Sequence, residues 1–244
     1  MKQYEVVIKV MEDNGGYATL GYLYQNVLNI RDVVWKTKTP FASIRRIVQD
    51  DRFFFKIKPG LWALKSHREK VLKNFSIDNK SSNKKQIEFD HTYYQGLLVD
   101  IGNLKGLQTF VPYQDKNRIY LSKPLLDFTS LERFYDFSYE RIVRRAVTVD
   151  VSWFNERNLP NSFFEVELTT DIQNSLLKFL ELQDFNTNFN IVAPDNRLKE
   201  FESKISYSAF KPIKERVKFL DFEKLSIYHS KMFEFQEISK KVKI

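Results

Sequence analysis

Apolar residues in the first 75 positions recur at near-helical spacing in three segments. These segments are residues 4–11, 19–27 and 39–49. Asn14-Gly15-Gly16 is a common helix stop, Thr19 is a good cap, and Pro40 stands at a first helical turn. Residues 53–57 and 61–64, joined by Lys58-Pro59-Gly60, follow as a strand, a turn and a strand. The pattern predicts three helices followed by a hairpin.

The third predicted helix has an apolar side and a polar side. Phe41, Ile44 and Val48 form a stripe that should face inward. The side chains expected to face outward, or to flank that face, are Ser43, Arg45, Arg46 and Gln49. Three helices, a basic outer face and a hairpin together make a winged helix-turn-helix arrangement, in which the third helix reads the major groove of DNA.

After this part, residues 76–90 are polar and lack apolar periodicity, which predicts a linker. Beyond it the pattern alternates between helical and strand periodicity. The predicted order is helix 93–104, strand 107–112, an aromatic insertion 113–139, strands 146–151 and 162–168, a helix after Thr169-Thr170-Asp171, strand 188–193 and a helix near 196–206. We therefore expect an α+β protein with domains at residues 1–75 and 91–244, the second an α/β domain with a mixed central sheet.

Three acids interrupt the two most apolar strands of the second domain. Asp150 stands near the end of one run, and Glu165 and Glu167 share one face of the next because alternate strand residues point the same way. Carboxylates are seldom buried unless something compensates them, and a divalent cation is a common compensation. Asp100, on the inward side of the preceding helix, is a further candidate acid. The alternative without a functional role is that Glu165 and Glu167 lie on an exposed polar face of the sheet and that Asp150 caps a hairpin.

The charge is uneven along the chain. The net charge is +8, and residues 1–75 hold 14 Lys and Arg against 7 Asp and Glu, so nearly all the excess lies in the first third. A basic segment of this kind attracts nucleic acid, because neutralising phosphates releases counterions. Candidate phosphate contacts are Lys36, Lys38, Lys56 and Lys58. A solvated basic face, or a winged helix that binds protein, is the alternative.

Composition removes several other classes. The chain has no Cys, and His67, His91 and His229 are not spaced as a metal pair or a triad, so histidine chemistry is not expected. No apolar stretch approaches the length of a membrane span, and the first residues lack the sections of a secretory signal, so we expect a soluble, cytoplasmic protein. Phosphate loops and dinucleotide fingerprints are missing from the sequence, so no nucleotide cofactor is indicated.

Three motifs in the first domain carry a family resemblance. They are Gly-Tyr-Ala-Thr-Leu before the second helix, Thr-Pro-Phe-Ala-Ser-Ile-Arg-Arg in the third, and Phe-Phe-Phe-Lys-Ile-Lys-Pro-Gly-Leu-Trp-Ala-Leu in the hairpin. The segment resembles the HARE-type helix-turn-helix domain, which occurs beside restriction endonucleases and in chromatin proteins. The resemblance covers about a third of the chain and implies DNA binding.

The order of helix, strand, strand with Asp and strand with Glu-x-Glu resembles the core of the PD-(D/E)XK nucleases. Carried over by position, the resemblance makes Asp150, Glu165 and the carbonyl of Val166 ligands of Mg²⁺, for which Mn²⁺ can substitute, and makes Asp100 the acid of the first helix. The third motif position, usually Lys, is Glu167 here. Gln173 or Lys178 on the next helix can take part of that role by orienting water or touching phosphate.

These features predict a type II-like restriction endonuclease that cuts double-stranded DNA at a specific sequence. Cutting both strands requires two active sites, so a homodimer is expected. The alternative from another class is a DNA-binding regulator without catalysis, built on a degenerate nuclease fold.

Overall fold

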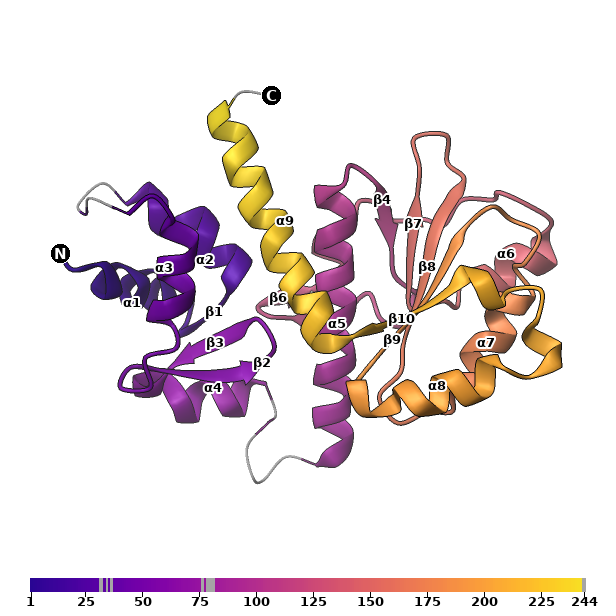
Figure 1. Ribbon diagram of the computed structural model, residues 1–244, viewed down its shortest axis with the longest axis horizontal. Coiled ribbons are helices and arrows are strands. Elements are labelled where there is room, and N and C mark those ends of the chain that lie inside the picture. The colour runs from indigo at the N-terminus through magenta and orange to yellow at the C-terminus, as the bar shows by residue number, and fades with distance from the viewer. Residues whose placement is uncertain (31–32, 34, 36, 76, 78–81, 243–244) are drawn as a thin grey trace. The chain divides into compact units, whose positions relative to one another are not determined.

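The computed structural model describes residues 1–242 except 31–32, 34, 36, 76 and 78–81, and its chain divides into two compact units (Figure 1). The first unit contains Met1–Gln86 together with Ser226–Ile244, and the second contains Ile87–Leu225. This division differs from the predicted domains at the C-terminus, because residues 226–244 were expected to belong to the second domain. Each unit has its own apolar core.

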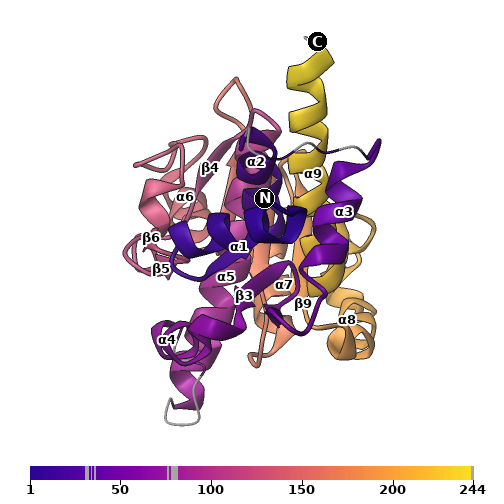
Figure 2. The ribbon, with the colours of Figure 1, turned by 90° about the vertical axis from the view of Figure 1, so that its left-hand side faces the viewer.

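The first unit holds a helical part and a three-stranded sheet (Figure 2). Its helices are α1 (Gln3–Asp13), α2 (Leu20–Asn26), α3 (Pro40–Ile47) and α4 (Arg68–Asn74). Its strands are β1 (Tyr17–Thr19), β2 (Phe54–Lys58) and β3 (Leu61–Leu64), in the antiparallel order β1-β3-β2. The three predicted helices and the predicted hairpin are therefore present, and the Oγ1 of Thr19 accepts the Tyr22 amide at 3.2 Å, as expected of its cap.

The predicted apolar stripe of α3 forms part of the core of the first unit. Phe41, Ile44 and Val48 are buried together with residues of α1 and α2. Strand β1 was not predicted, because all three of its residues are buried and so show no alternation between apolar and polar positions. Apart from the unpredicted β1 and α4, the elements follow the predicted order of three helices and a hairpin, and the winged-helix assignment itself remains a prediction.

Beyond residue 225, the C-terminal helix α9 (Phe222–Val242) belongs to the first unit. Phe233 packs against the apolar core of this unit. A Cβ atom placed on Gly21 of α2 would lie 2.5 Å from the Phe233 ring, so the glycine provides the space that this ring occupies. From its aromatic residues, we expected the segment 219–235 to be part of a core or of a dimer surface, and Phe233 packs, partly buried, against the core of the first unit.

The second unit is built on a five-stranded mixed sheet in the order β10-β9-β8-β7-β4. The strands are β4 (Gln108–Phe110), β7 (Val151–Phe154), β8 (Pro160–Val166), β9 (Asn188–Ala193) and β10 (Val217–Asp221). Strands β8, β9 and β10 run parallel, whereas β7 is antiparallel to both β8 and β4. The expected mixed central sheet is thus present.

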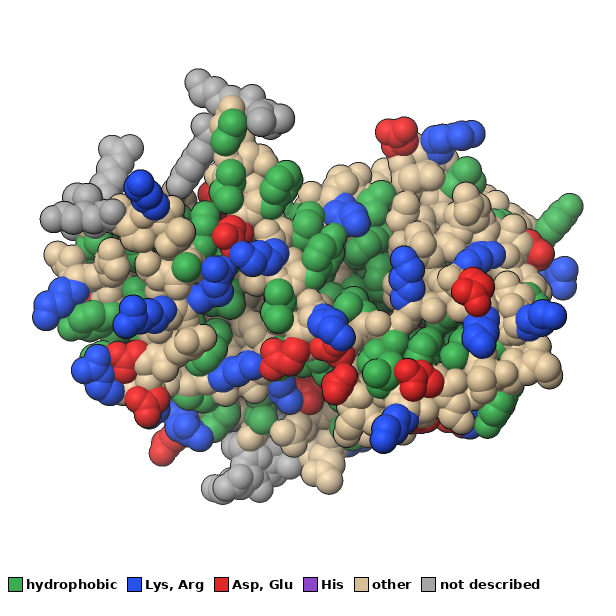
Figure 3. Space-filling view, in the orientation of Figure 1, with side chains coloured by type: hydrophobic (Ala, Val, Ile, Leu, Met, Phe, Trp, Pro, Cys, Tyr) green, Lys and Arg blue, Asp and Glu red, His purple; other side chains and the backbone are tan. Residues whose placement is uncertain are grey.

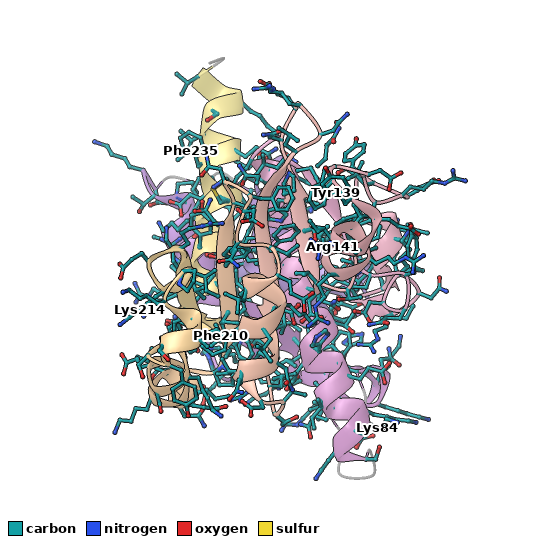
Figure 4. The ribbon with its side chains drawn as sticks, turned by 90° about the vertical axis from the view of Figure 1, so that its right-hand side faces the viewer. Lys84, Tyr139, Arg141, Phe210, Lys214 and Phe235 are labelled. Atoms are coloured by element: carbon teal, nitrogen blue, oxygen red, sulfur yellow. The ribbon has the colours of Figure 1, made fainter. Side chains whose placement is uncertain are left out.

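Helices and a small hairpin complete the second unit. The helices are α5 (Asn83–Leu104), α6 (Glu140–Ala146), α7 (Ile172–Leu180) and α8 (Leu198–Ile205), and the hairpin is β5 (Ile119–Tyr120) with β6 (Lys123–Pro124). Figure 4 shows Tyr139 and Arg141 at the beginning of α6, and Phe210 and Lys214 in the segment between α8 and β10. Phe210 is buried in the core formed by α7, α8, β9 and their neighbours, whereas Lys214 is exposed.

Two predicted boundaries in this unit were wrong. The linker predicted at 76–90 overlaps the first turns of α5, which begins at Asn83. The helix was not predicted there because the polar residues of these turns are mostly exposed to solvent and show no apolar periodicity. The strand predicted at 146–151 is instead the end of α6 at Ala146, a turn, and the first residue of β7 at Val151. Ala146 and Val149 are buried in the core of the second unit although neither lies in a strand, so their apolar character reflects burial and not an extended backbone.

None of the helices in the part of the chain that the structure describes is both long and apolar enough to cross a membrane.

Candidate active site

The mixed sheet brings Asp150 beside the end of β8. Strand β7 is antiparallel to β8, and Val151 pairs with Phe164, so the residue before β7 lies next to the residues that end β8. The backbone amide of Val166 donates a hydrogen bond of 2.7 Å to Oδ2 of Asp150. This bond joins Asp150 to a residue 16 positions later in the sequence, the one between Glu165 and Glu167.

Asp150, Glu165, Val166 and Glu167 line one cavity of about 290 Å³. Helix α5 contributes His91 to this cavity, and helix α7 contributes Ser175 and Lys178. The predicted helix cap of α7 is present, since Oδ1 of Asp171 accepts the Gln173 amide at 2.9 Å. The cap fixes the start of the helix that carries the cationic side chain of the site.

Glu165 is the most deeply buried acid of the cavity, with 3% of its surface exposed. The ammonium of Lys178 donates to its two carboxylate oxygens at 2.8 and 2.9 Å, and the Ser175 hydroxyl lies 3.1 Å from Oε2. Burial and the neighbouring charge of Asp150 raise the pKa of Glu165 to about 8, although Lys178 acts in the opposite direction. In this arrangement Glu165 readily holds a proton near neutral pH.

Asp150 is kept ionised by its partners. Burial disfavours its charge, but His91 and the Val166 amide together hold the pKa of Asp150 below its usual value. Nε2 of His91 lies 3.2 Å from Oδ2 of Asp150. Burial lowers the pKa of His91, but the charge of Asp150 prevails and raises it overall. Two neighbouring carboxyl groups with pKa values shifted in opposite directions are typical of functional sites.

His91 is a residue that the sequence analysis missed. It was discounted because no second imidazole stands at metal-pair or triad spacing, yet its partner is a carboxylate from a distant segment. Helical spacing places His91 and Gln95 one turn apart on α5, but their shared contact with Asp150 has no signal in the sequence.

Glu167, a third acid that lines the cavity, is held by other residues of the protein. Its carboxylate accepts hydrogen bonds from the hydroxyls of Thr170 and Ser175, and Nη1 of Arg197 lies 4.0 Å from Oε2. Burial raises the pKa of Glu167 against these stabilising contacts. Ser175 thereby links Glu165 to Glu167.

Two residues assigned to the site from the sequence lie elsewhere. Asp100 accepts a hydrogen bond of 2.9 Å from the Tyr120 hydroxyl and does not line the cavity, because it is more than two helical turns beyond His91. Gln173 is paired through Oε1 with the ammonium of Lys204 at 3.2 Å and also lies outside the lining. Gln173 and Lys178 were the two candidates to replace the lysine that the motif usually has at position 167, and of these two the cavity lining includes Lys178.

The residues predicted to contact DNA belong to the first unit. Lys36 lies outside the described residues, while Lys38, Arg46, Gln49 and Lys56 are exposed, and Ser43 and Lys58 are half-buried. Arg45 is already engaged, because its Nη1 lies 2.9 Å from both the Tyr24 hydroxyl and Oε2 of Glu234 on α9. On the face shown in Figure 3, basic and acidic side chains are interspersed.

The donor set of the cavity suits a hard divalent cation with few protein ligands. Mg²⁺ is commonly bound by one or two carboxylates and keeps several waters. Asp150 and Glu165 offer two carboxylates, and burial together with the charge of Asp150 raises the pKa of Glu165. Among the described residues, no group of three or more His, Cys, Asp and Glu side chains is arranged to hold a metal, so a cage made only of protein ligands is not formed there.

The chain resembles a known restriction enzyme. Over 115 residues it is 28% identical to the type II restriction enzyme NmeDI of Neisseria meningitidis serogroup C, a match that covers 43% of this chain and 33% of that enzyme. The chain thus matches about a third of the length of this relative. No solved structure matches the chain. The model of the family described as type II restriction enzyme NmeDI C-terminal domain matches residues 71–242. Because this match covers more than half of the sequence, the chain belongs to that family.

Proposed function

We propose that this chain is a type II-like restriction endonuclease, which hydrolyses phosphodiester bonds of double-stranded DNA at a specific sequence with the help of Mg²⁺. The observation that carries the proposal is the placement of Asp150 and Glu165 in one cavity with the ammonium of Lys178. The family match supports it, because the matching relative is by its name a type II restriction enzyme.

In this proposal Asp150, Glu165 and the carbonyl of Val166 are the residues that hold the cation. When bound, Mg²⁺ would supply Lewis-acid chemistry, activating a water molecule and polarising the phosphate. His91 and the Val166 amide hold Oδ2 of Asp150, which fixes the orientation of its carboxylate. Ser175 and Lys178 hold Glu165 in the same way.

Lys178 takes the role that Lys has at the third position of the PD-(D/E)XK motif. Its ammonium reaches the carboxylate of Glu165 from helix α7 rather than from β8. A cation at this place stabilises the negative charge that develops on a phosphate under attack. Glu167, which occupies the motif position, is committed to Ser175, Thr170 and Arg197, and so anchors α7 against the end of β8.

DNA recognition belongs to the first unit in this proposal. The exposed residues Arg46 of α3 and Gln49 of the turn that follows it are the candidates for contact with base edges, as in a HARE-type winged helix. Lys38, Lys56 and Lys58 are the candidates for contact with phosphates. Two copies of the chain bring one active site to each DNA strand, as a homodimer.

Plasmid cleavage tests the proposal most directly. We expect discrete fragments in Mg²⁺ and also in Mn²⁺, with no cleavage in EDTA or by a Glu165→Ala variant. The matched control is Glu181→Ala, because Glu181 is an exposed acid paired with Arg145 on the same helical layer. A protein that binds duplex DNA but leaves methylated and unmethylated plasmid intact in both metals would show a DNA-binding regulator instead.

A further inference from the structure

We propose that Gln95 and Asp115 are positioning residues, which fix the backbone of Asp150 so that its carboxylate faces the cavity. This inference rests on the proposed function, since it assigns Asp150 to the cation site. It extends that function to two buried residues that are not part of the cavity lining.

The side-chain amide of Gln95 joins two acidic residues. Gln95 is fully buried, and its Nε2 donates to Oδ2 of Asp115 at 2.8 Å and to the backbone carbonyl of Asp150 at 3.1 Å. An amide nitrogen has two hydrogens, so both bonds are made at once. Asp115 is itself only 2% exposed, and Nε of Arg118 lies 3.1 Å from its second oxygen.

The backbone at Asp150 needs such a partner because of its place in the sheet. The pairing of β7 with β8 begins at Val151, so the residue before it lies outside the ladder. Helix α5 holds that residue at two points, since His91 contacts its carboxylate and Gln95, one turn later, contacts its carbonyl. With the backbone and Oδ2 both fixed, the carboxylate keeps a single orientation.

The acceptor that orients Gln95 comes from the segment between β4 and α6. Asp115 lies there, and Arg118 of the same segment also lies 3.7 Å from Glu88 of α5. A hydrogen bond between a buried amide and a buried carboxylate is costly to break, because Nε2 of Gln95 would lose one of its acceptors and Oδ2 of Asp115 would lose this donor. The segment therefore contributes to the site through hydrogen bonds rather than through a side chain in the cavity.

Mn²⁺ binding to the full chain, measured by isothermal titration calorimetry, tests this role without requiring DNA cleavage. Gln95→Met keeps length and apolar volume but removes the amide, and we expect it to weaken Mn²⁺ binding about 10- to 100-fold, as outer partners of metal ligands do. Asp115→Asn still offers an oxygen to Gln95, so we expect its Mn²⁺ affinity to stay within about threefold of the wild type.

Thr109→Val is the matched control. Thr109 is fully buried in the same sheet, and its hydroxyl donates to Asn103 at 2.9 Å and accepts from the Ser130 amide at 3.1 Å, so it is bonded to residues other than Asp150. We expect this variant to lower the melting temperature by a similar amount as Gln95→Met and to bind Mn²⁺ normally. Normal Mn²⁺ binding by Gln95→Met, or equal weakening by Thr109→Val, would overturn the positioning role. If the wild-type chain did not bind Mn²⁺, the proposed function would be contradicted, and this inference, which rests on it, would fail as well.

Discussion

At the residue scale, the lysine of the cavity comes from a different position in the chain than the sequence motif provides. Position 167, where the motif usually has Lys, is Glu. The lysine that contacts Glu165 is Lys178 on α7, 13 residues after Glu165. One helical turn before Lys178, Ser175 meets the same carboxylate. The acid and its two partners thus come from a strand and the helix that follows it.

Replacing Lys178 by Met should abolish most cleavage. The change leaves Glu165 buried without its cation and removes a positive charge from the phosphate position, so we expect a loss of about 100-fold or more in the cleavage rate at saturating Mg²⁺. Lys178→Arg, which keeps the charge, should recover part of it. Lys204→Met, on the neighbouring helix and outside the cavity lining, serves as the control. Unchanged single-turnover cleavage by Lys178→Met would contradict the assignment.

The raised pKa of Glu165 predicts how the stability of the metal-free protein depends on pH. Because the folded state holds this proton up to about pH 8 and the unfolded chain releases it near 4.5, the stability of the second unit should fall as pH rises between these values. The loss should amount to a few kcal/mol at most, at about 1.4 kcal/mol for each pH unit.

Glu165→Gln should make this pH dependence shallower, with residual slope from Glu167 and His91, whose pKa values are also raised. Hydrogen exchange of β8 and α7 peptides across a urea series in EDTA, at pH 5, 6.5 and 8, measures it. Equal slopes for the wild type and Glu165→Gln would show that the proton is held elsewhere.

At the element scale, local patterns predicted some regular elements, missed others such as β1, α6 and β10, and predicted the long-range pairs poorly. Strand β9 was predicted at its observed bounds, and β8 within two residues, because their apolar runs are bounded by turn residues. Glu165 and Asp150 were expected together from the element order, and the cavity contains both. The partnership of His91 with Asp150 was not predictable, since 59 residues separate them and only the packing of α5 brings them together.

Close packing of α5 predicts the effect of a single methyl group. A Cβ atom on Gly96 would lie 2.2 Å from the ring of the fully buried Tyr120, so Gly96→Ala should destabilise the second unit by about 1–3 kcal/mol through overpacking. Combining it with Tyr120→Leu should cost less than the sum of the two single changes.

Gly106→Ala is the comparison for this cycle. Gly106 has a φ of +71° and open space around it, so its substitution costs backbone strain of about 1–2 kcal/mol and should add independently to Tyr120→Leu. Urea unfolding of all five variants and the wild type supplies the cycle. Additive free energies for Gly96→Ala and Tyr120→Leu would rule out overpacking as the cause.

At the scale of the whole molecule, the first unit is completed by a helix from the other end of the sequence. Arg45 on α3 and Glu234 on α9 form an ion pair of 2.9 Å, and Phe233 packs on the core beside it. The packing of α9 on the first unit could not be predicted from the sequence, because a helix with aromatic and polar residues can pack on any apolar surface of the protein.

Phe233→Ala should weaken the first unit without affecting the second. Loss of a partly buried aromatic ring costs about 1–3 kcal/mol, and the affected contacts are those of α2 and α3. Hydrogen-exchange mass spectrometry should show faster exchange in peptides from 20–26 and 40–47 and unchanged exchange in 160–166. The exposed Phe235→Ala is the control. Faster exchange in all three peptides would mean that the two units unfold together.

The return of α9 to the first unit also sets an order of events on the ribosome. Residues 87–225 form a unit continuous in sequence, whereas the first unit needs residues from both sides of it. Domains fold as their residues emerge. Every residue of the sheet with Asp150 and Glu165 therefore leaves the ribosome before Phe233 does, and until Phe233 follows, the core of α1–α3 has one apolar side uncovered. For this protein, the unit that begins first is finished last.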